Sequence, residues 1–339
     1  MRRWNVLTLL FTIAFCAFMW AIVAFWCMMV ASTGYGWPAT HEVLLIRGEV
    51  VLLSSLVGAA LAAAGVTYQA ILRNPLADPY LLGVSSGAAL FAYLWRLPAL
   101  TGIATLLGAA SQQGFAFAGA LIAVFWVLAF ASRRGRLEPV TVLLVGVIIN
   151  ALNGSIFLLV YSLVSTLPSS EGALTLLVGG IQTGLTPQQI RAACVVIALG
   201  WIILLAISGQ LNAAGVGDVE AEALGVRIQR LRWIALVVAS LVTASAVAIS
   251  GPIGFIGLIC PHLARLFVGT DQRRLLPVST AFGAGLLCAA DAVSRRLAGE
   301  GLAQTLLPVG VLTSLLGGPF FLLLLIRNRR RADVMEGRI

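Results

Sequence analysis

The sequence contains no lysine, since all 22 of its basic residues are arginine. An ATP-hydrolysing P-loop needs a lysine on the β- and γ-phosphates, so the chain cannot carry an ordinary ATPase site, and Schiff-base chemistry is excluded for the same reason. Only two histidines are present, His41 and His262, and no group of His, Cys, Asp and Glu has the spacing of a metal site. We therefore expect no enzymatic activity and no cofactor or metal bound by this chain.

Charged residues are also scarce, at 10% of the 339 residues, whereas soluble globular proteins carry roughly 25%. Hydrophobic residues make up 60% of the chain, and about ten stretches approach or exceed the ~20 apolar residues that cross a bilayer. We predict an all-α polytopic membrane protein in which residues 1–339 form a single transmembrane domain. The expected spans are 5–30, 50–70, 80–95, 114–132, 140–164, 190–208, 233–250, 254–268, 276–297 and 305–326.

The first apolar stretch follows Arg2 and Arg3, as it would in a signal peptide. It is longer than the ~7–15 residues of a signal peptide's apolar region, and no small-residue cleavage site follows closely. We therefore expect a retained first helix with its N-terminus inside.

The arginines then divide unevenly between the two sides of the predicted bundle. Of the 22, 17 fall at ends predicted to be cytoplasmic. Because membrane proteins concentrate arginine in cytoplasmic loops, this bias places both termini in the cytoplasm. It also accounts for the net charge of +9 without nucleic acid as a partner. The five arginines on the outer side are Arg47, Arg96, Arg191, Arg295 and Arg296.

Small residues recur at helical spacing within the predicted spans. Gly58, Ala62 and Gly65 mark one such face, and Gly83 with Gly87 mark another. In lipid, helices associate by close approach through small residues, because burying leucine against leucine gains nothing there. The pattern predicts a tightly packed bundle.

The segment from Gly65 to Ala88 interrupts the apolar pattern with two prolines, Pro75 and Pro79. Two prolines four residues apart would each remove a hydrogen bond from the middle of a helix. They predict a bent connection between two spans, with Asn74 and Asp78 as turn or capping residues.

At this segment the sequence resembles the permease family of type II ABC importers, which carry vitamin B12, iron-siderophore complexes and haem. The family's signature is a glutamine, then RNPLA-x-P, then LGVS-x-GA. The residues that match it here are Gln69, Arg73, Asn74, Pro75, Pro79, Gly83 and Gly87.

Three further segments resemble the family in the same order along the chain. Residues 251–265 resemble its GFIGL-x-x-PH-x-x-R stretch, and residues 307–321 resemble its last span. The remaining segment, which precedes these two in the chain, lies within a polar loop at about 210–232. It resembles the cytoplasmic loop that couples the permease to its ATPase. Its acidic start and Gly225 predict a short helix that the glycine terminates, although a plain solvated loop is the alternative. The predicted coupling residues are Asp218, Glu220, Ala221, Glu222, Leu224 and Gly225.

Two arginines resemble family positions where a substrate-binding protein docks on the outer surface. They are Arg47 and Arg295, and Arg295 stands at i, i+4 from Asp291, a spacing that pairs opposite charges. For Arg295 a local salt bridge and a docking contact are equally open. The chain departs from the family at Glu49, Val50 and Leu306, which predicts a binding protein with a different charge pattern.

The resemblance implies a type II ABC importer permease fold in a bacterial inner membrane, assembled as a homodimer. Two cytoplasmic ATPase subunits would use ATP and Mg²⁺, and a periplasmic or lipid-anchored binding protein would deliver the substrate. The inner gate would lie at about residues 138–153, with Glu138, Thr141 and Asn150.

The expected substrate is an iron(III)-siderophore complex, with haem or cobalamin as the alternative. A remote alternative is an ion-coupled secondary transporter, which would need buried acidic relays and often an inverted repeat. Asp291 is the only deep carboxylate that could serve, and no repeat is visible.

Overall fold

The computed structural model describes residues 6–31, 34–97, 112–133, 135–164, 176–182, 184–299 and 307–335. Within these ranges the chain is almost entirely helical. The longer helices are α1 (Val6–Met29), α2 (His41–Ile71), α3 (Val84–Trp95), α5 (Gln112–Ala131), α6 (Pro139–Val164), α7 (Pro187–Val216), α9 (Ile228–Ser250), α10 (Ile256–Val268), α11 (Gln272–Gly299) and α12 (Val309–Met335). The short elements are η1 (Pro79–Leu82), α8 (Asp218–Ala223) and two-residue strands β1 (Val30–Ala31), β2 (Gly34–Tyr35), β3 (Ser132–Arg133) and β4 (Arg136–Leu137).

The prediction of about ten membrane helices is confirmed in the described part of the chain. Seven helices are long and apolar enough to cross a bilayer, and three shorter apolar helices complete the set. Of these three, α3 has 12 residues and α10 has 13. At 1.5 Å per residue such a helix covers only about 20 Å of a ~30 Å hydrocarbon core. The predicted spans at 80–95 and 254–268 are therefore shorter helices that follow irregular segments.

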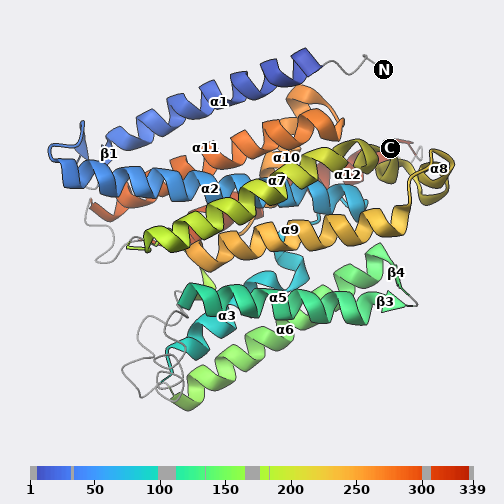
Figure 1. Cartoon of the computed structure of the whole chain (residues 1–339), viewed down its shortest axis with the longest axis horizontal. Coiled ribbons are helices and arrows are strands. Elements are labelled where there is room, and N and C mark those ends of the chain that lie inside the picture. The colour runs from blue at the N-terminus through green and yellow to red at the C-terminus, as the bar shows by residue number, and fades with distance from the viewer. Residues whose placement is uncertain are drawn as a thin grey trace.

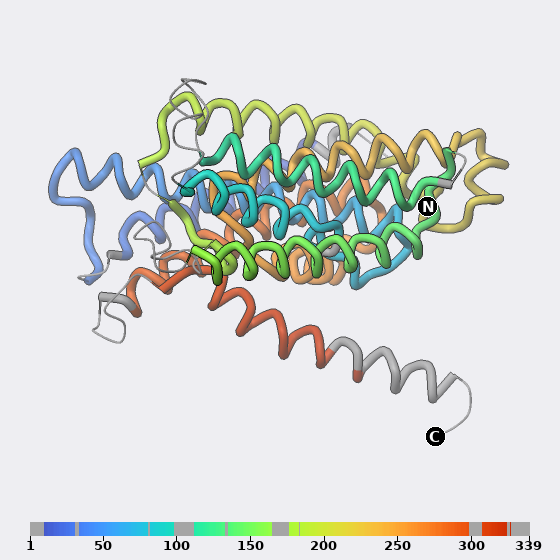
Figure 2. The backbone as a smooth tube through the Cα atoms, turned by 90° about the horizontal axis from the view of Figure 1, so that it is seen from below, coloured from blue at the N-terminus to red at the C-terminus, as the bar shows by residue number. Residues whose placement is uncertain are grey.

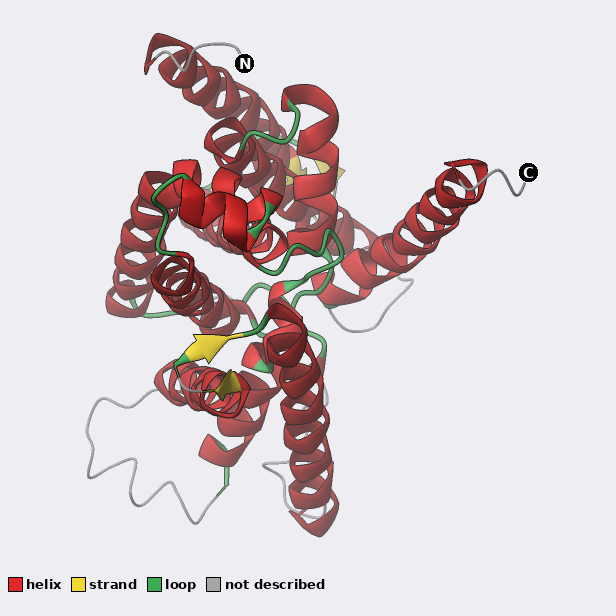
Figure 3. Cartoon of the chain, turned by 90° about the vertical axis from the view of Figure 1, so that its right-hand side faces the viewer, coloured by secondary structure: helices red, strands yellow, loops and turns green. Residues whose placement is uncertain are grey.

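The helices lie side by side along the long axis of the molecule, with α2 near the middle (Figure 1). Helices α9, α10 and α11 pack against α2, while α3, α5 and α6 form a neighbouring group. Helix α1 lies at the edge of the bundle against α11, and α12 diverges from the other helices (Figures 2 and 3).

Glycines set the separation of the central helices, as predicted for Gly58 and Gly65. A methyl group on Gly58 would lie 2.1 Å from the carbonyl oxygen of Gly283, and one on Gly65 would lie 2.0 Å from that of Gly257. The backbones of α2, α11 and α10 can therefore touch, which explains why residues 50–72 of the α2 segment are almost all buried.

Gly83 and Gly87 both lie against Ala123 of α5, as their spacing predicts, but only Gly87 belongs to the helix. Gly83 precedes α3 in the left-handed region, with φ 72°, and ends η1. Gly87 does mediate helix packing, because a methyl group there would lie 2.5 Å from the carbonyl oxygen of Gly119.

The two ends of the bundle differ in composition. One end holds α8 and the β3–β4 hairpin, and the other holds the β1–β2 hairpin with the start of α2 (Figure 1). Arg136 belongs to β4 at the α8 end, and Arg227, Arg230 and Arg232 lie at the start of α9, which follows α8. That this end faces the cytoplasm stays a prediction from the positive-inside rule.

Candidate functional site

The turn between α2 and α3 has the bent form that its prolines predict. Asn74 Oδ1 accepts a hydrogen bond from the Leu76 N–H at 2.9 Å, and Asp78 Oδ1 accepts one from the Tyr80 N–H at 2.9 Å. Asp78 thus caps η1, with Pro79 as its first residue. Both predicted turn and capping roles are confirmed. Arg73 opens the turn with a φ of 50°, a conformation that non-glycine residues seldom adopt.

The same turn contacts the start of α10. Gln69 Nε2 donates to the carbonyl oxygen of Gly257 at 3.2 Å. The ring of Pro79 lies so close that a methyl group on Gly257 would be 2.5 Å from its Cδ. Signature residues of the turn therefore hold it against α10.

Asp78 lies outside the membrane-spanning helices and keeps some exposed surface. Burial of its carboxyl group raises its pKa to about 6 from an ordinary 3.8, while backbone N–H donors of Tyr80 and Phe255 pull it down. The hydrogen bond to Phe255 also ties this turn to the residue that precedes α10.

Helix α8 is the short helix that the sequence predicts, and Gly225 ends it. The Gly225 N–H donates to the Glu222 carbonyl and the Val226 N–H to the Ala221 carbonyl, both at 2.9 Å. With φ 80° at Gly225, this is a Schellman termination.

The predicted coupling loop at 210–232 is shorter in the structure. Residues 210–216 continue α7 and residues 228–232 begin α9, so only about 217–227 leave the long helices. The physical reason is that polar side chains of this stretch find partners within the bundle. Asn212 Nδ2 donates to Asp271 Oδ1 at 2.7 Å, and the Gln272 N–H donates to Asn212 Oδ1 at 2.8 Å.

The six predicted coupling residues face in two directions. Glu220, Glu222, Leu224 and Gly225 are exposed to solvent, and the exposed fraction of Leu224 is 73%. Val219 beside them is 77% exposed. Ala221 is fully buried, and Asp218 turns towards the bundle. The outward face of α8 is therefore an apolar and acidic surface.

Asp218 binds two arginines through one carboxylate oxygen. Oδ1 accepts hydrogen bonds from Arg73 Nη2 and, at 2.8 Å, from Arg232 Nη2. Arg73 Nε also donates to the Ala214 carbonyl at 2.7 Å, and Arg232 Nη1 donates to the Leu137 carbonyl at 3.2 Å. Nothing in the spacing of Arg232 along the sequence indicates this pairing, since Asp218 is 14 positions away.

The β3–β4 hairpin is joined to the start of α9 by further hydrogen bonds. The Leu137 N–H donates to Gln229 Oε1 at 3.0 Å, and Trp233 Nε1 donates to the Gly135 carbonyl at 3.2 Å. Helix α6 begins directly after this hairpin.

The predicted gate residues lie on α6 or directly before it. Thr141 Oγ1 donates to Glu138 Oε2 at 2.9 Å near the α8 end, whereas Asn150 lies half-buried further along the helix. Much of the rest of α6 is exposed and apolar. The gate role of these residues stays a prediction.

At the opposite end, both predicted docking arginines have partners within the chain. Arg47 Nη1 donates to the carbonyl oxygens of Met28 and Gly36, each at 2.9 Å. Arg295 Nε lies 3.0 Å from Asp291 Oδ2, so the local salt bridge is present. A docking role for either arginine stays a prediction, and Leu306 lies outside the described residues.

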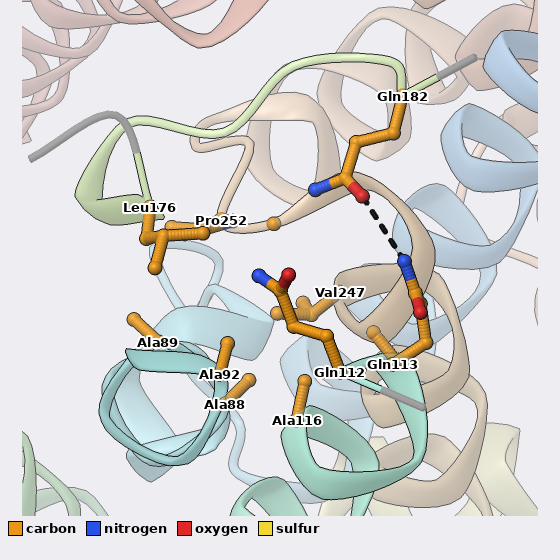
Figure 4. Close-up of a pocket in the computed structure, with 12 residues that line it drawn as sticks. Ala88, Ala89, Ala92, Gln112, Gln113, Ala116, Leu176, Gln182, Val247 and Pro252 are labelled. Atoms are coloured by element: carbon orange, nitrogen blue, oxygen red, sulfur yellow. Dashed lines mark hydrogen bonds between the residues drawn. The ribbon is translucent and has the colours of Figure 1, made fainter. Parts of the chain in front are cut away.

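A chain of glutamine amides at this end was missed in the sequence. Gln113 Nε2 donates to Gln182 Oε1 at 3.2 Å, and Gln189 Nε2 donates to Gln113 Oε1 at 3.1 Å. Figure 4 shows Gln112, Gln113 and Gln182 around a small pocket whose other walls are mostly alanine. These contacts join residues 69 and 76 positions apart, a separation at which no local pattern can reveal them.

Comparisons with known proteins agree with this architecture. Residues 6–327 match the FecCD transport family. The chain is 42% identical over 307 residues to the cobalamin import system permease protein BtuC of Halobacterium salinarum, covering 89% of this chain and 78% of that one. It is 39% identical to the hemin transport system permease protein HmuU of Yersinia pestis, covering 86% and 85%.

Among solved structures, the chain is similar to an inward-facing metal-chelate type ABC transporter. The TM-score is 0.79 at 27% identity, and the match covers 94% of this chain and 99% of that one.

Proposed function

The chain belongs to the FecCD transport family and is a multi-pass membrane permease of the ABC importer type; from this premise we propose that it imports an iron(III)-siderophore-type complex. In this proposal it works as a homodimer in the inner membrane, by alternating access. Two separate ATPase subunits bind its cytoplasmic end, and a binding protein delivers the complex outside.

The outward face of α8 is the observation that carries the proposal. Exposed apolar side chains such as Val219 and Leu224 beside acidic Glu222 suit a protein partner, because a solitary solvated loop would gain nothing from exposing them. The absence of lysine means that this partner must supply ATP hydrolysis. A partner that binds one state of the permease more tightly shifts its equilibrium towards that state.

The proposed cargo follows from the family alone. Permeases of iron-siderophores are the commonest members that the sequence resembles, which is why this cargo comes first. The relatives named for cobalamin and hemin support the alternative that this chain carries one of those compounds. Uptake of ferric hydroxamate, haemin and cyanocobalamin, measured side by side, distinguishes the three.

The coupling role of α8 is tested by Glu222→Gln and Leu224→Ala. We expect both substitutions to lower uptake and substrate-stimulated ATP hydrolysis, while the chain still inserts into the membrane. Leu199→Ala is a matched control, because Leu199 is 57% exposed on α7 and lies within a predicted span. Unchanged stimulation in both α8 variants would show that this face does not couple the two subunits.

A further inference from the structure

Asp218 is the first residue of α8, yet its carboxylate contacts two other parts of the chain. We propose that Arg73, Asp218 and Arg232 form a charge clasp that transmits movement of α8 to the turn at residues 72–83 and to the β3–β4 hairpin. This inference rests on the proposed importer function and assigns to these residues the positioning of α8 relative to the bundle.

The Arg232 half of the clasp is fixed. The Arg232 side chain is only 5% exposed, and its Nε is buried with no hydrogen-bond partner among the residues that the structure describes. Its remaining bonds go to Asp218 and to the Leu137 carbonyl. A buried guanidinium that lost its carboxylate would be left uncompensated. The ion pair between Asp218 of α8 and Arg232 of α9 therefore stays intact when α8 moves.

The Arg73 half can open. The side chains of Arg73 and Asp218 are 32% and 40% exposed, and ion pairs at such sites exchange readily with water. The backbone of Arg73 is held at φ 50°, which is unfavourable for a residue with a side chain. Opening of this ion pair would release the turn from α8 and leave Arg73 bound to the Ala214 carbonyl at the end of α7.

The turn is connected to the parts of the bundle that must move. Gln69 and Pro79 contact Gly257 at the start of α10. Gly83, which ends η1, lies against Ile149 of α6, since a methyl group on it would be 3.0 Å from that side chain. On the Arg232 side, Leu137 directly precedes the segment of the predicted gate. A displacement of α8 is therefore transmitted to α6 by two routes. One runs through Arg73 and the turn at residues 72–83, and the other runs through Arg232 and Leu137.

The test uses the complex purified through a tag on this chain and reconstituted in lipid nanodiscs. The variants are Arg73→Gln, Arg73→Lys and Asp218→Asn, with Arg230→Gln as the matched control, since Arg230 is exposed on α9 two residues from Arg232. ATP hydrolysis is measured with and without the cargo-loaded binding protein, and the amount of bound ATPase is measured in each preparation.

We expect Arg73→Gln to reduce the stimulation of ATP hydrolysis by at least about fivefold, the lower end of typical coupling between sites. The amount of bound ATPase should not change, Arg73→Lys should restore much of the stimulation, and Arg230→Gln should behave as wild type. Adding Asp218→Asn to Arg73→Gln should cause a smaller further loss than Asp218→Asn causes alone, because the two substitutions share the Arg73–Asp218 ion pair and only the second also removes the partner of Arg232.

Full stimulation in Arg73→Gln, or an equal loss in Arg230→Gln, overturns the clasp. Arg73→Gln is decisive even if Asp218→Asn fails to fold, because Arg73 is on the surface of the turn. If the wild-type chain binds no ATPase, the proposed function itself is wrong. If the wild-type complex forms and Arg73→Gln keeps full stimulation of ATP hydrolysis, only the inference about Arg73 is wrong.

Discussion

The lack of a β-carbon at Gly65 determines how closely α2 and α10 can approach each other. Its α-carbon lies so close to α10 that a methyl group would be 2.0 Å from the Gly257 carbonyl oxygen. Backbone atoms cannot move aside as a flexible side chain can, so the two helices would have to separate. The small-residue pattern in the sequence predicted a close contact at this position but not its partner.

We predict that Gly65→Ala destabilises the protein by about 1–3 kcal/mol or more, the usual cost of overpacking. Thermal unfolding in detergent, followed by size-exclusion chromatography, measures the loss. Gly48→Ala is the matched control on the same helix, because a methyl group there meets no atom of the described residues within 4 Å. Equal melting temperatures for the two variants would contradict the close approach of α2 and α10.

Asp78 makes a pH-dependent contribution to stability. Because burial raises its pKa in the folded protein to about 6 from 3.8, its contribution is fully present below about pH 3.8. It is lost as the pH rises through about 6. We predict that Asp78→Asn, which keeps an oxygen acceptor for Tyr80, reduces the fall in melting temperature between pH 5 and pH 8.

Asp78→Ala is the companion variant, since it also removes the charge but loses the cap of η1. Its melting temperature should lie below that of Asp78→Asn at both pH values. The loss of the cap should lower its free energy of unfolding by about 1 kcal/mol. An unchanged pH dependence in Asp78→Asn would show that other groups cause it.

Local chemistry made the turn predictable at the residue scale, whereas the charge clasp was not. Pro75, Pro79, Asn74 and Asp78 act within a few positions of one another, so their spacing alone indicates a turn. The Arg73–Asp218 pair joins residues 145 positions apart. Only the packing of α7 against both α2 and α8 brings them together.

Helix α8 depends on Gly225 for its termination. A residue with a β-carbon at φ 80° costs roughly 1–2 kcal/mol, although no neighbouring atom would collide with it. We predict that Gly225→Ala frays α8 and lowers the amount of ATPase subunit that co-purifies with the chain. Gly215→Ala is the control, because Gly215 is helical and equally unobstructed.

Equal retention of the ATPase subunit by Gly225→Ala and Gly215→Ala would mean that the shape of α8 does not matter for docking. Quantitative mass spectrometry of the purified complexes measures this retention directly.

The lengths of the apolar stretches predict which segments form membrane helices, but they do not predict where those helices begin and end. Polar residues at 210–216 suggested a loop, yet Asn212 is satisfied by Asp271 and Gln272, and α7 continues to Val216. Likewise α3 and α10 are short because the chain before each is bent at Pro79 and at residues 251–255. Tertiary contacts determine such ends, and hydropathy does not record them.

For the whole molecule, the uneven distribution of arginine predicts the orientation in the membrane. In a background without the five native cysteines, we predict that a cysteine replacing His41 reacts with an impermeant maleimide added to intact spheroplasts. A cysteine replacing Arg227 should react only after permeabilisation. The opposite labelling pattern would reverse the topology and place α8 outside, away from any cytoplasmic ATPase.

The central claim is that this chain is moved by a separate ATPase, and one preparation tests it. The chain with Leu224→Cys is purified from its native membrane in a gentle detergent, cross-linked with a short bifunctional reagent, and analysed by mass spectrometry. We predict a P-loop ATPase in equal amount, cross-linked through position 224 of α8. Uptake by cells that carry the wild-type chain should stop when ATP is depleted. A chain that purifies alone in several detergents, with uptake that follows an ion gradient and ignores ATP, would contradict the account and favour an ion-coupled transporter.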